Sequence, residues 1–145
     1  MQLSKAFGYG IRALLYIAQH HQEGQNIGLQ DLAEQLNAPR HFLGKIMQEL
    51  SKRGLVHSAK GPGGGFTLKE ETLDLPVIKV VEAIDGLESF KKCAMGFEEC
   101  SEDHPCPLHD TIKAYKNGLL QSLRTHTLRD MRHRLDKDET FLKEI

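Results

Sequence analysis

The amino-terminal segment carries apolar residues on two sides of a predicted helix. Within each line the spacing is three or four residues, which is the period of an α-helix. One line consists of Leu3, Phe7, Ile11, Leu14 and Ala18, and the other of Ala6, Gly10, Ala13 and Ile17. A helix that is apolar on two sides is buried on two sides. We therefore expect residues 1–22 to lie at a dimer interface as well as in their own domain.

Two further helices follow, and together they predict a helix-turn-helix. The apolar residues of the first of these are Leu29, Leu32, Ala33 and Leu36. The next helix runs from Pro39, which suits a first helical position, to Gly54, which suits a carboxy-terminal cap. Its predicted inward face consists of Leu43, Ile46, Met47 and Leu50. Its outward face carries basic and amide side chains, which is typical of a recognition helix.

Residues 55–68, "LVHSAKGPGGGFTL", predict a β-hairpin wing with a glycine-rich tip. The tip does not match the G-x-G-x-x-G of dinucleotide sites, and no Gly-Lys-Ser/Thr follows it. It also enters a strand rather than a helix, so we expect no nucleotide site. Glycines such as Gly63 and Gly64 would let the backbone approach a DNA phosphate closely.

The second half of the chain predicts two more helices that carry an apolar face. Residues 75–85 form a short one that ends at Gly86, and a longer one of about five turns follows residue 107. The apolar seam of the longer helix consists of Leu108, Ile112, Tyr115, Leu119 and Leu123. One chain can hardly cover this seam and also close its own core. We therefore expect a homodimer in which the same helix of a second subunit covers it. Thr127 is expected to cap a last short helix.

Composition places the chain among ordinary globular proteins. It has 145 residues, of which 39% are hydrophobic and 27% charged, as in a domain with a substantial core. We expect no membrane span, because no apolar run is long enough, and a cytoplasmic location, because the first residues lack a secretory signal. No nucleophile with its base and no pair of catalytic carboxylates can be placed, so we do not expect an enzyme.

The net charge of −1 conceals a basic segment over residues 38–60. Its basic side chains stand against Glu49 as the single acid. Together with the helix-turn-helix and the wing, this segment predicts a double-stranded DNA operator as the partner. The expected phosphate contacts are Lys45, Lys52, Arg53 and Lys60. The expected contacts to base edges are Arg40, His41 and Gln48.

Residues 93–109, "CAMGFEECSEDHPCPLH", contain all three cysteines of the chain. Four explanations are open: inert buried thiols, structural zinc, a redox disulfide and an iron–sulfur cluster. The acidic surroundings disfavour inert thiols, and the C-x-x-C knuckles usual for zinc are absent. An iron–sulfur cluster suits Cys93, Cys100 and Cys106 better, because thiolates are its normal ligands and a polar loop can wrap it.

Two histidines are candidates for a further ligand. His109 is expected one turn into the long helix, and His104 lies in the loop before it. Because Cys106 directly precedes Pro107, we expect Cys106 to cap that helix, where the amide dipoles favour the thiolate.

Four stretches of the chain resemble the bacterial iron–sulfur regulators of the Rrf-two family, of the IscR and NsrR type. They are the opening "MQLSKAFGYGIRALLYIA", the "LSKRGLV" that ends the helix-turn-helix, the wing "KGPGGGFTL", and the cysteine trio before a long helix. The resemblance covers nearly the whole chain. It implies a mainly α fold with a small β-hairpin wing, in which a winged helix-turn-helix precedes a long dimerisation helix.

The resemblance also implies a division of the chain. Residues 1–86 would form the DNA-binding domain, residues 87–106 the cysteine-rich cluster-binding loop, and residues 107–145 the dimerisation helix and carboxy-terminal tail. IscR-type members hold a [2Fe-2S] cluster with three cysteines and a histidine three residues after the last. This pattern implies Cys93, Cys100, Cys106 and His109 as the ligands here.

Two positions differ from the family pattern. NsrR-type members recruit an acidic residue from the first helix of the partner, and Gly8 stands at that position here. Six residues separate Cys93 from Cys100, where five are usual.

The resemblance implies a transcriptional regulator whose operator affinity is switched by an iron–sulfur cluster. The cluster would be [2Fe-2S], with [4Fe-4S] as the second candidate, and would respond to redox state, nitric oxide or cluster supply. The alternative is a cluster-free winged-helix regulator that uses its cysteines as thiol sensors or binds a metabolic enzyme.

Overall fold

The computed structural model describes residues 3–20 and 25–142 of the chain. Parts of the predicted interface segment, residues 1–2 and 21–22, lie outside the described residues, as do residues 143–145 of the predicted tail. The described part is mainly helical with one two-stranded antiparallel sheet, which confirms the predicted fold class. None of its helices has the length and apolar content that a membrane crossing requires.

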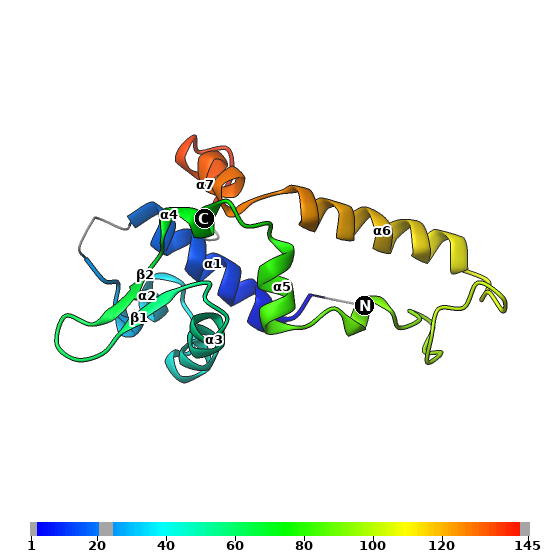
Figure 1. Ribbon diagram of the computed structural model, residues 1–145, viewed down its shortest axis with the longest axis horizontal. Helices are drawn as coiled ribbons and strands as arrows, with labels where there is room; N and C mark the ends of the chain where they lie inside the picture. The colour runs from blue at the N-terminus through cyan, green and yellow to red at the C-terminus, as the bar shows by residue number, and fades with distance from the viewer. Residues whose placement is uncertain (1–2, 21–24, 143–145) are drawn as a thin grey trace.

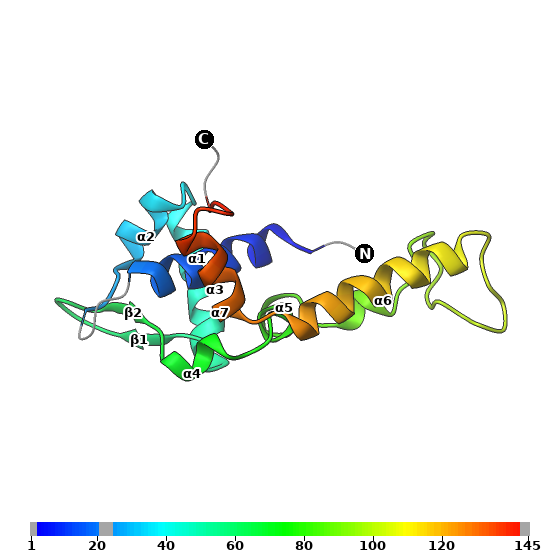
Figure 2. The ribbon, with the colours of Figure 1, turned by 90° about the horizontal axis from the view of Figure 1, so that it is seen from above.

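Most of the elements form a body from which one long helix projects (Figure 1). The elements are α1 (Lys5–His20), α2 (Leu29–Gln35), α3 (Arg40–Lys52), β1 (His57–Ala59), β2 (Gly65–Thr67), α4 (Glu70–Leu73), α5 (Ile78–Ile84), η1 (Glu88–Phe90), α6 (His109–Thr125) and α7 (Leu128–Asp136). Figure 2 shows the same arrangement from above, with α6 and the loop before it extending away together. The cysteine segment therefore lies at the far end of the molecule from the wing.

Helix α1 is the centre of the body and contacts α3, α5 and α7. Both of its predicted apolar lines are covered within the chain. The buried residues of the two lines are Phe7, Gly10, Ile11, Ala13, Leu14 and Ile17. Contacts within one chain thus account for the two-sided pattern, and a place for residues 1–22 at a dimer interface stays a prediction.

The helix-turn-helix has the predicted boundaries to within one residue. After α2, the backbone leaves the helical conformation at Asn37, which has a φ of 49°. Pro39 is the N-cap of α3 rather than its first residue. Gly54 ends the unit with a φ of 74°, which favours glycine because it has no Cβ. The four residues predicted to face inward from α3 are all buried: Leu43, Ile46, Met47 and Leu50.

The wing is held to the body by the segment before α2. The backbone of Ile27 pairs with Phe66 of β2, and the side-chain amide of Asn26 donates to the carbonyl oxygen of Gly63 at 2.9 Å. A Cβ on Gly64 would lie 2.4 Å from the carbonyl oxygen of Ala59. The tip can therefore turn this tightly only with glycine at that position.

Helix α7 closes the body from the other side. The predicted cap is confirmed, because Thr127 and Asp130 form a reciprocal capping box. Arg129 of α7 donates to the carboxylate of Asp74 at 2.8 Å and also contacts Glu70. The hydrogen bond from Arg129 lowers the pKa of Asp74, as expected for a carboxylate that accepts from a guanidinium.

Helix α6 begins at His109, and its N-cap is Leu108. The prediction that Cys106 caps this helix is therefore wrong. The backbone N–H of His109 donates to the carbonyl oxygen of Cys106 at 2.9 Å, which adds a tight turn over residues 106–109 before the first helical turn. His109 is consequently the first helical residue rather than one turn in.

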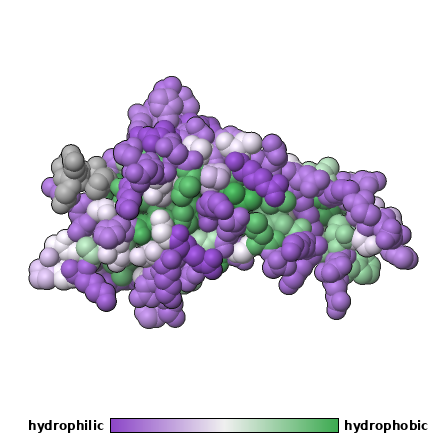
Figure 3. All heavy atoms as spheres, in the orientation of Figure 1, coloured by the Kyte–Doolittle hydropathy of each residue, from purple (hydrophilic) through white to green (hydrophobic). Residues whose placement is uncertain are grey.

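The predicted dimer seam on α6 is exposed over its first part. Leu108 is 49% exposed and Tyr115 62% exposed, whereas Leu123 is buried in the core of its own chain. Figure 3, in the orientation of Figure 1, shows hydrophobic residues gathered along the middle of the side of the molecule that faces the viewer, with hydrophilic residues around most of its outline. Pairing of α6 with a second copy stays a prediction, now centred on residues 108–119.

Substitution at Gly10 tests the packing at the centre of the body. A Cβ there would lie 2.4 Å from Cδ1 of Ile84 and 3.2 Å from Cγ2 of Ile46, so Gly10→Ala is expected to destabilise the fold by about 1–3 kcal/mol through overpacking. Gly8→Ala is the control, because nothing lies within 4 Å of that position. The control is expected to stabilise α1 by about 0.5–1 kcal/mol, since alanine is the better helix former. Urea unfolding followed by circular dichroism measures both; equal effects would contradict close packing at Gly10.

Candidate functional site

The outward face of α3 forms a hollow beside the start of α2. It has a volume of about 470 Å³, and its lining residues are Leu29, Arg40, His41, Gly44, Lys45 and Gln48. The three side chains expected to read base edges thus share one surface with Lys45, and all four are exposed. Sequence reasoning missed the contribution of Leu29, which was assigned only to the core.

The other predicted phosphate contacts lie at the end of α3 and on the wing, and all are exposed. Arg53 is paired with Glu49 at 3.4 Å; an exposed pair of this kind contributes little, so a DNA phosphate could replace the carboxylate. On the wing, the backbone N–H of Gly64 already donates to Gly61, whereas Gly63 is exposed. Within the tip, Gly64 shapes the turn and Gly63 is better placed to approach a phosphate.

The predicted metal ligands lie together at the far end of the molecule. We call these residues the four candidate ligands: Cys93, Cys100, Cys106 and His109. All four line one pocket of about 450 Å³, the cysteine pocket, between the loop and the start of α6. The three thiols are free. His104 also lines this pocket but is exposed.

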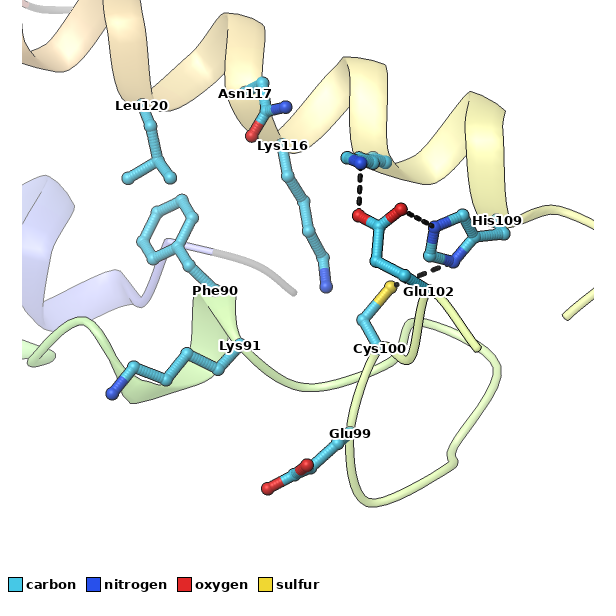
Figure 4. A pocket seen from close by; sticks show the side chains of 10 residues that line it. Phe90, Lys91, Glu99, Cys100, Glu102, His109, Lys116, Asn117 and Leu120 are labelled. Carbon is cyan, nitrogen blue, oxygen red and sulfur yellow. Dashed lines mark hydrogen bonds and ion pairs between the residues drawn. The ribbon is translucent and has the colours of Figure 1, made fainter. Parts of the chain in front are cut away.

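The imidazole of His109 lies between a thiol and a carboxylate (Figure 4). Its Nδ1 is 3.5 Å from Sγ of Cys100, and its Nε2 is 3.9 Å from Oε2 of Glu102. His109 is only 6% exposed, and Nε2 is buried without a hydrogen bond. A buried polar atom without a partner is costly, so Nε2 depends on the nearby carboxylate of Glu102. Nδ1 faces the thiol side and is the nitrogen that a bound group would use.

Cys93 lies in surroundings that favour its thiolate. A hydrogen bond from the backbone of Met95 is the main cause of a lowered pKa at the Cys93 thiol, with further contributions from the backbone of Phe97, the Cys106 thiol and the charge of Lys116. Thiolates rather than thiols bind metals. These surroundings would suit Cys93 as a metal ligand.

A second pocket of about 390 Å³, the lysine pocket, adjoins the cysteine pocket and shares Cys100 and His109 with it. Lys116 of α6 lines it and is only 5% exposed. Sequence reasoning missed Lys116. The available signal was spacing, because positions 109, 113, 116 and 120 follow one another at four, three and four residues and share one face of a helix.

Glu102 and Lys113 form an ion pair over the same pocket. The hydrogen bond between them lowers the pKa of Glu102 and raises that of Lys113. The pair keeps a carboxylate in its charged form beside His109. Such a carboxylate can orient an imidazole that ligates a metal.

The donors surround the cysteine pocket rather than converge on one point. Within residues 3–20 and 25–142, no three His, Cys, Asp or Glu side chains are close enough to hold a single metal ion. A tetrahedral zinc site would need such convergence. The free thiols, the thiolate-favouring surroundings of Cys93 and the Nδ1 of His109 that faces Cys100 instead fit a larger thiolate-bound group.

A helix-turn-helix with a basic outward face and a glycine-tipped wing defines a winged-helix DNA-binding regulator. A family model named Rrf2 and described as an iron-dependent transcriptional regulator matches residues 3–134. The chain belongs to this family, and the resemblance found in the sequence is confirmed. It is a transcriptional regulator that binds DNA.

Relatives and solved structures agree with this assignment. The chain is 30% identical over 131 residues to the HTH-type transcriptional regulator IscR of Pectobacterium atrosepticum. The matched residues make up 90% of this chain and 79% of the relative. Its fold is similar to that of CymR, the global cysteine regulator of B. subtilis, with a TM-score of 0.74, 22% identity and coverage of 92% and 97% of the two chains. It is also similar to T. potens IscR, with a TM-score of 0.73, 23% identity and coverage of 97% and 93%.

Removal of single lysines tests the DNA interface. Lys45→Ala and Lys60→Ala are each expected to weaken binding to specific and random duplexes alike. Each should lower the slope of log affinity against log salt by about 1, because each removes one phosphate contact. Lys137→Ala, on the opposite side of the body after α7, is the control and should leave the slope unchanged. Fluorescence anisotropy in rising salt measures the slopes; unchanged slopes for both wing and helix variants would place the DNA elsewhere.

Proposed function

We propose that this regulator holds an iron–sulfur cluster in the cysteine pocket and that the state of the cluster sets its affinity for operator DNA. One observation carries the proposal. Three free thiols and a buried imidazole line the same pocket, although up to fifteen intervening positions separate them along the sequence. Thiolates with an added histidine are an established ligand type for [2Fe-2S] clusters, and three or four thiolates also serve [4Fe-4S] clusters.

Two of the four candidate ligands, Cys93 and His109, have distinct roles in this proposal. Cys93 enters as a thiolate, because its backbone hydrogen bonds already favour that form. His109 is held by its position at the first turn of α6, with Glu102 on its far side. When bound, the cluster would supply one-electron redox chemistry and reactivity toward oxidants and nitric oxide. The residues of the chain supply binding, orientation and charge.

The loop is joined to the recognition helix through α5. The loop leaves α5 at Asp85, whose carboxylate accepts from the backbone N–H of Ser4 at the start of α1 at 2.9 Å. Ile84 of α5 and Ile46 of α3 meet over Gly10 of α1. Order imposed on the loop would therefore bear on α5, and through α5 on the packing of α3.

A dimer completes the proposed switch. The exposed seam on α6 would pair with the same seam of a second subunit, and residues 1–22 would add to that interface. Two recognition helices would then face half-sites about 34 Å apart, one helical turn of DNA. Small changes in the angle of α6 would change the distance between them. Operator affinity would follow the fraction of protein in the matching arrangement.

Anaerobic spectroscopy tests the cluster. Protein purified without oxygen is expected to show broad visible absorbance and to contain iron and acid-labile sulfide. Cys100→Ala should abolish these bands, and His109→Ala should change or abolish them. His104→Ala is the control, because this exposed residue lines the same pocket, and its spectrum should match that of the unaltered protein. Colourless protein that holds zinc or no metal would rule the cluster out.

The switch is tested on DNA selected from a random duplex library. Cluster-loaded and cluster-free protein should differ in affinity for the selected operator by about 5-fold or more, the lower end of ordinary allosteric coupling. Cys100→Ala should bind with the affinity of the cluster-free form. Equal affinities for loaded and cluster-free protein would contradict the switch but not the cluster.

The contact between Cys100 and His109 also favours a second candidate, a cluster-free thiol sensor. The sulfur of Cys100 lies 3.5 Å from a ring nitrogen of His109, and a histidine beside a cysteine is a common feature of reactive thiols. The similarity in fold to the cysteine regulator CymR agrees with this candidate. If iron-free protein changes its operator affinity on treatment with peroxide or a disulfide, and Cys100→Ser removes the change, the thiol sensor is the better account.

A further inference from the structure

Lys116 is a buried positive charge without a carboxylate partner. It is 5% exposed, and its ammonium donates to the backbone carbonyl of Lys92. Among the described residues, no acidic side chain lies within ion-pair distance of it. A buried charge normally has an ionic partner, because removal from water costs several kcal/mol per ion. Its burial here therefore calls for an anion nearby.

The other lysines around the lysine pocket are already paired. Lys113 is paired with Glu102 and Lys91 with Glu88 at 2.9 Å, and both lysines reach water. Glu99 also lines the pocket but is exposed. The anion that complements Lys116 must come from the buried side, where the cysteine loop passes.

That side carries the thiol of Cys93, one residue beyond the carbonyl that Lys116 binds. Figure 4 shows Lys116 reaching from α6 toward the loop, beside Cys100. Lys116 and Cys100 line the lysine pocket together, so one candidate ligand shares that pocket with the ammonium.

We propose that Lys116 is the fixed cation of the cysteine site. It offsets the negative charge of the thiolate ligands, fixes the backbone at Lys92 so that Cys93 faces the pocket, and raises the reduction potential of the cluster bound there. The inference rests on the proposed function. A positive charge in a site of low polarity favours the form that carries one more electron.

Lys116→Met tests this role, because methionine keeps the length of the side chain and removes its charge. The reconstituted variant should retain visible bands but have a more negative reduction potential. The expected change is a tenfold or larger shift of the one-electron equilibrium, about 59 mV or more. Lys116→Arg, which keeps the charge, should restore the potential. In the cluster-free variant, the loop around residues 92–93 should exchange amide hydrogens faster than in the unaltered protein.

Lys91→Met is the matched control, because it removes one charge from the same pocket at a side chain that is 72% exposed. Water screens that charge, so the potential should stay close to that of the unaltered protein. If the unaltered protein forms a cluster and Lys116→Met leaves its potential unchanged, the inference fails while the proposed function stands. If the unaltered protein forms no cluster, the proposed function fails and the inference fails with it.

Discussion

The structure depends on one close approach, the crossing of α1 with α3 and α5 at Gly10. A side chain at that position would press on Ile84 from α5 and Ile46 from α3, so the three helices can meet only where α1 has no Cβ. Helix α3 presents the basic face, and α5 leads into the cysteine loop. The DNA face and the cysteine pocket are therefore attached to the same small region of core.

Helix α6 is supported in a different way from the helices of the body. It contacts α5 near one end, and its inner face covers the loop through residues such as Lys116 and Leu120. The cysteine pocket thus forms between one helix and one loop rather than inside a core. Such regions open at lower free energy than core helices do. A group bound on both sides of the pocket would add order where the chain alone provides little, which suits a sensor.

The charged groups around the pocket come from two elements, helix α6 and the loop before it. Helix α6 contributes His109, Lys113 and Lys116 on one face, and the loop contributes thiols and carboxylates. Lys113 engages Glu102, whereas Lys116 engages only a backbone carbonyl of the loop. The helix therefore brings positive charge to the place where the candidate ligands would bring the negative charge of thiolates.

Sequence patterns alone predicted the helices and the wing, because periodicity and turns depend on near neighbours in the chain. The buried face of α3, the tight turn at Gly64 and the cap at Thr127 all follow from local patterns. Tertiary structure decided what meets across long separations: Asn26 reaches the wing 37 residues away, and Lys116 reaches the loop 24 residues away. Sequence periodicity reflects residues only a few positions apart, so it does not predict such contacts. The four candidate ligands could be named from their residue types, but the course of the loop between α5 and α6 brought them to one pocket.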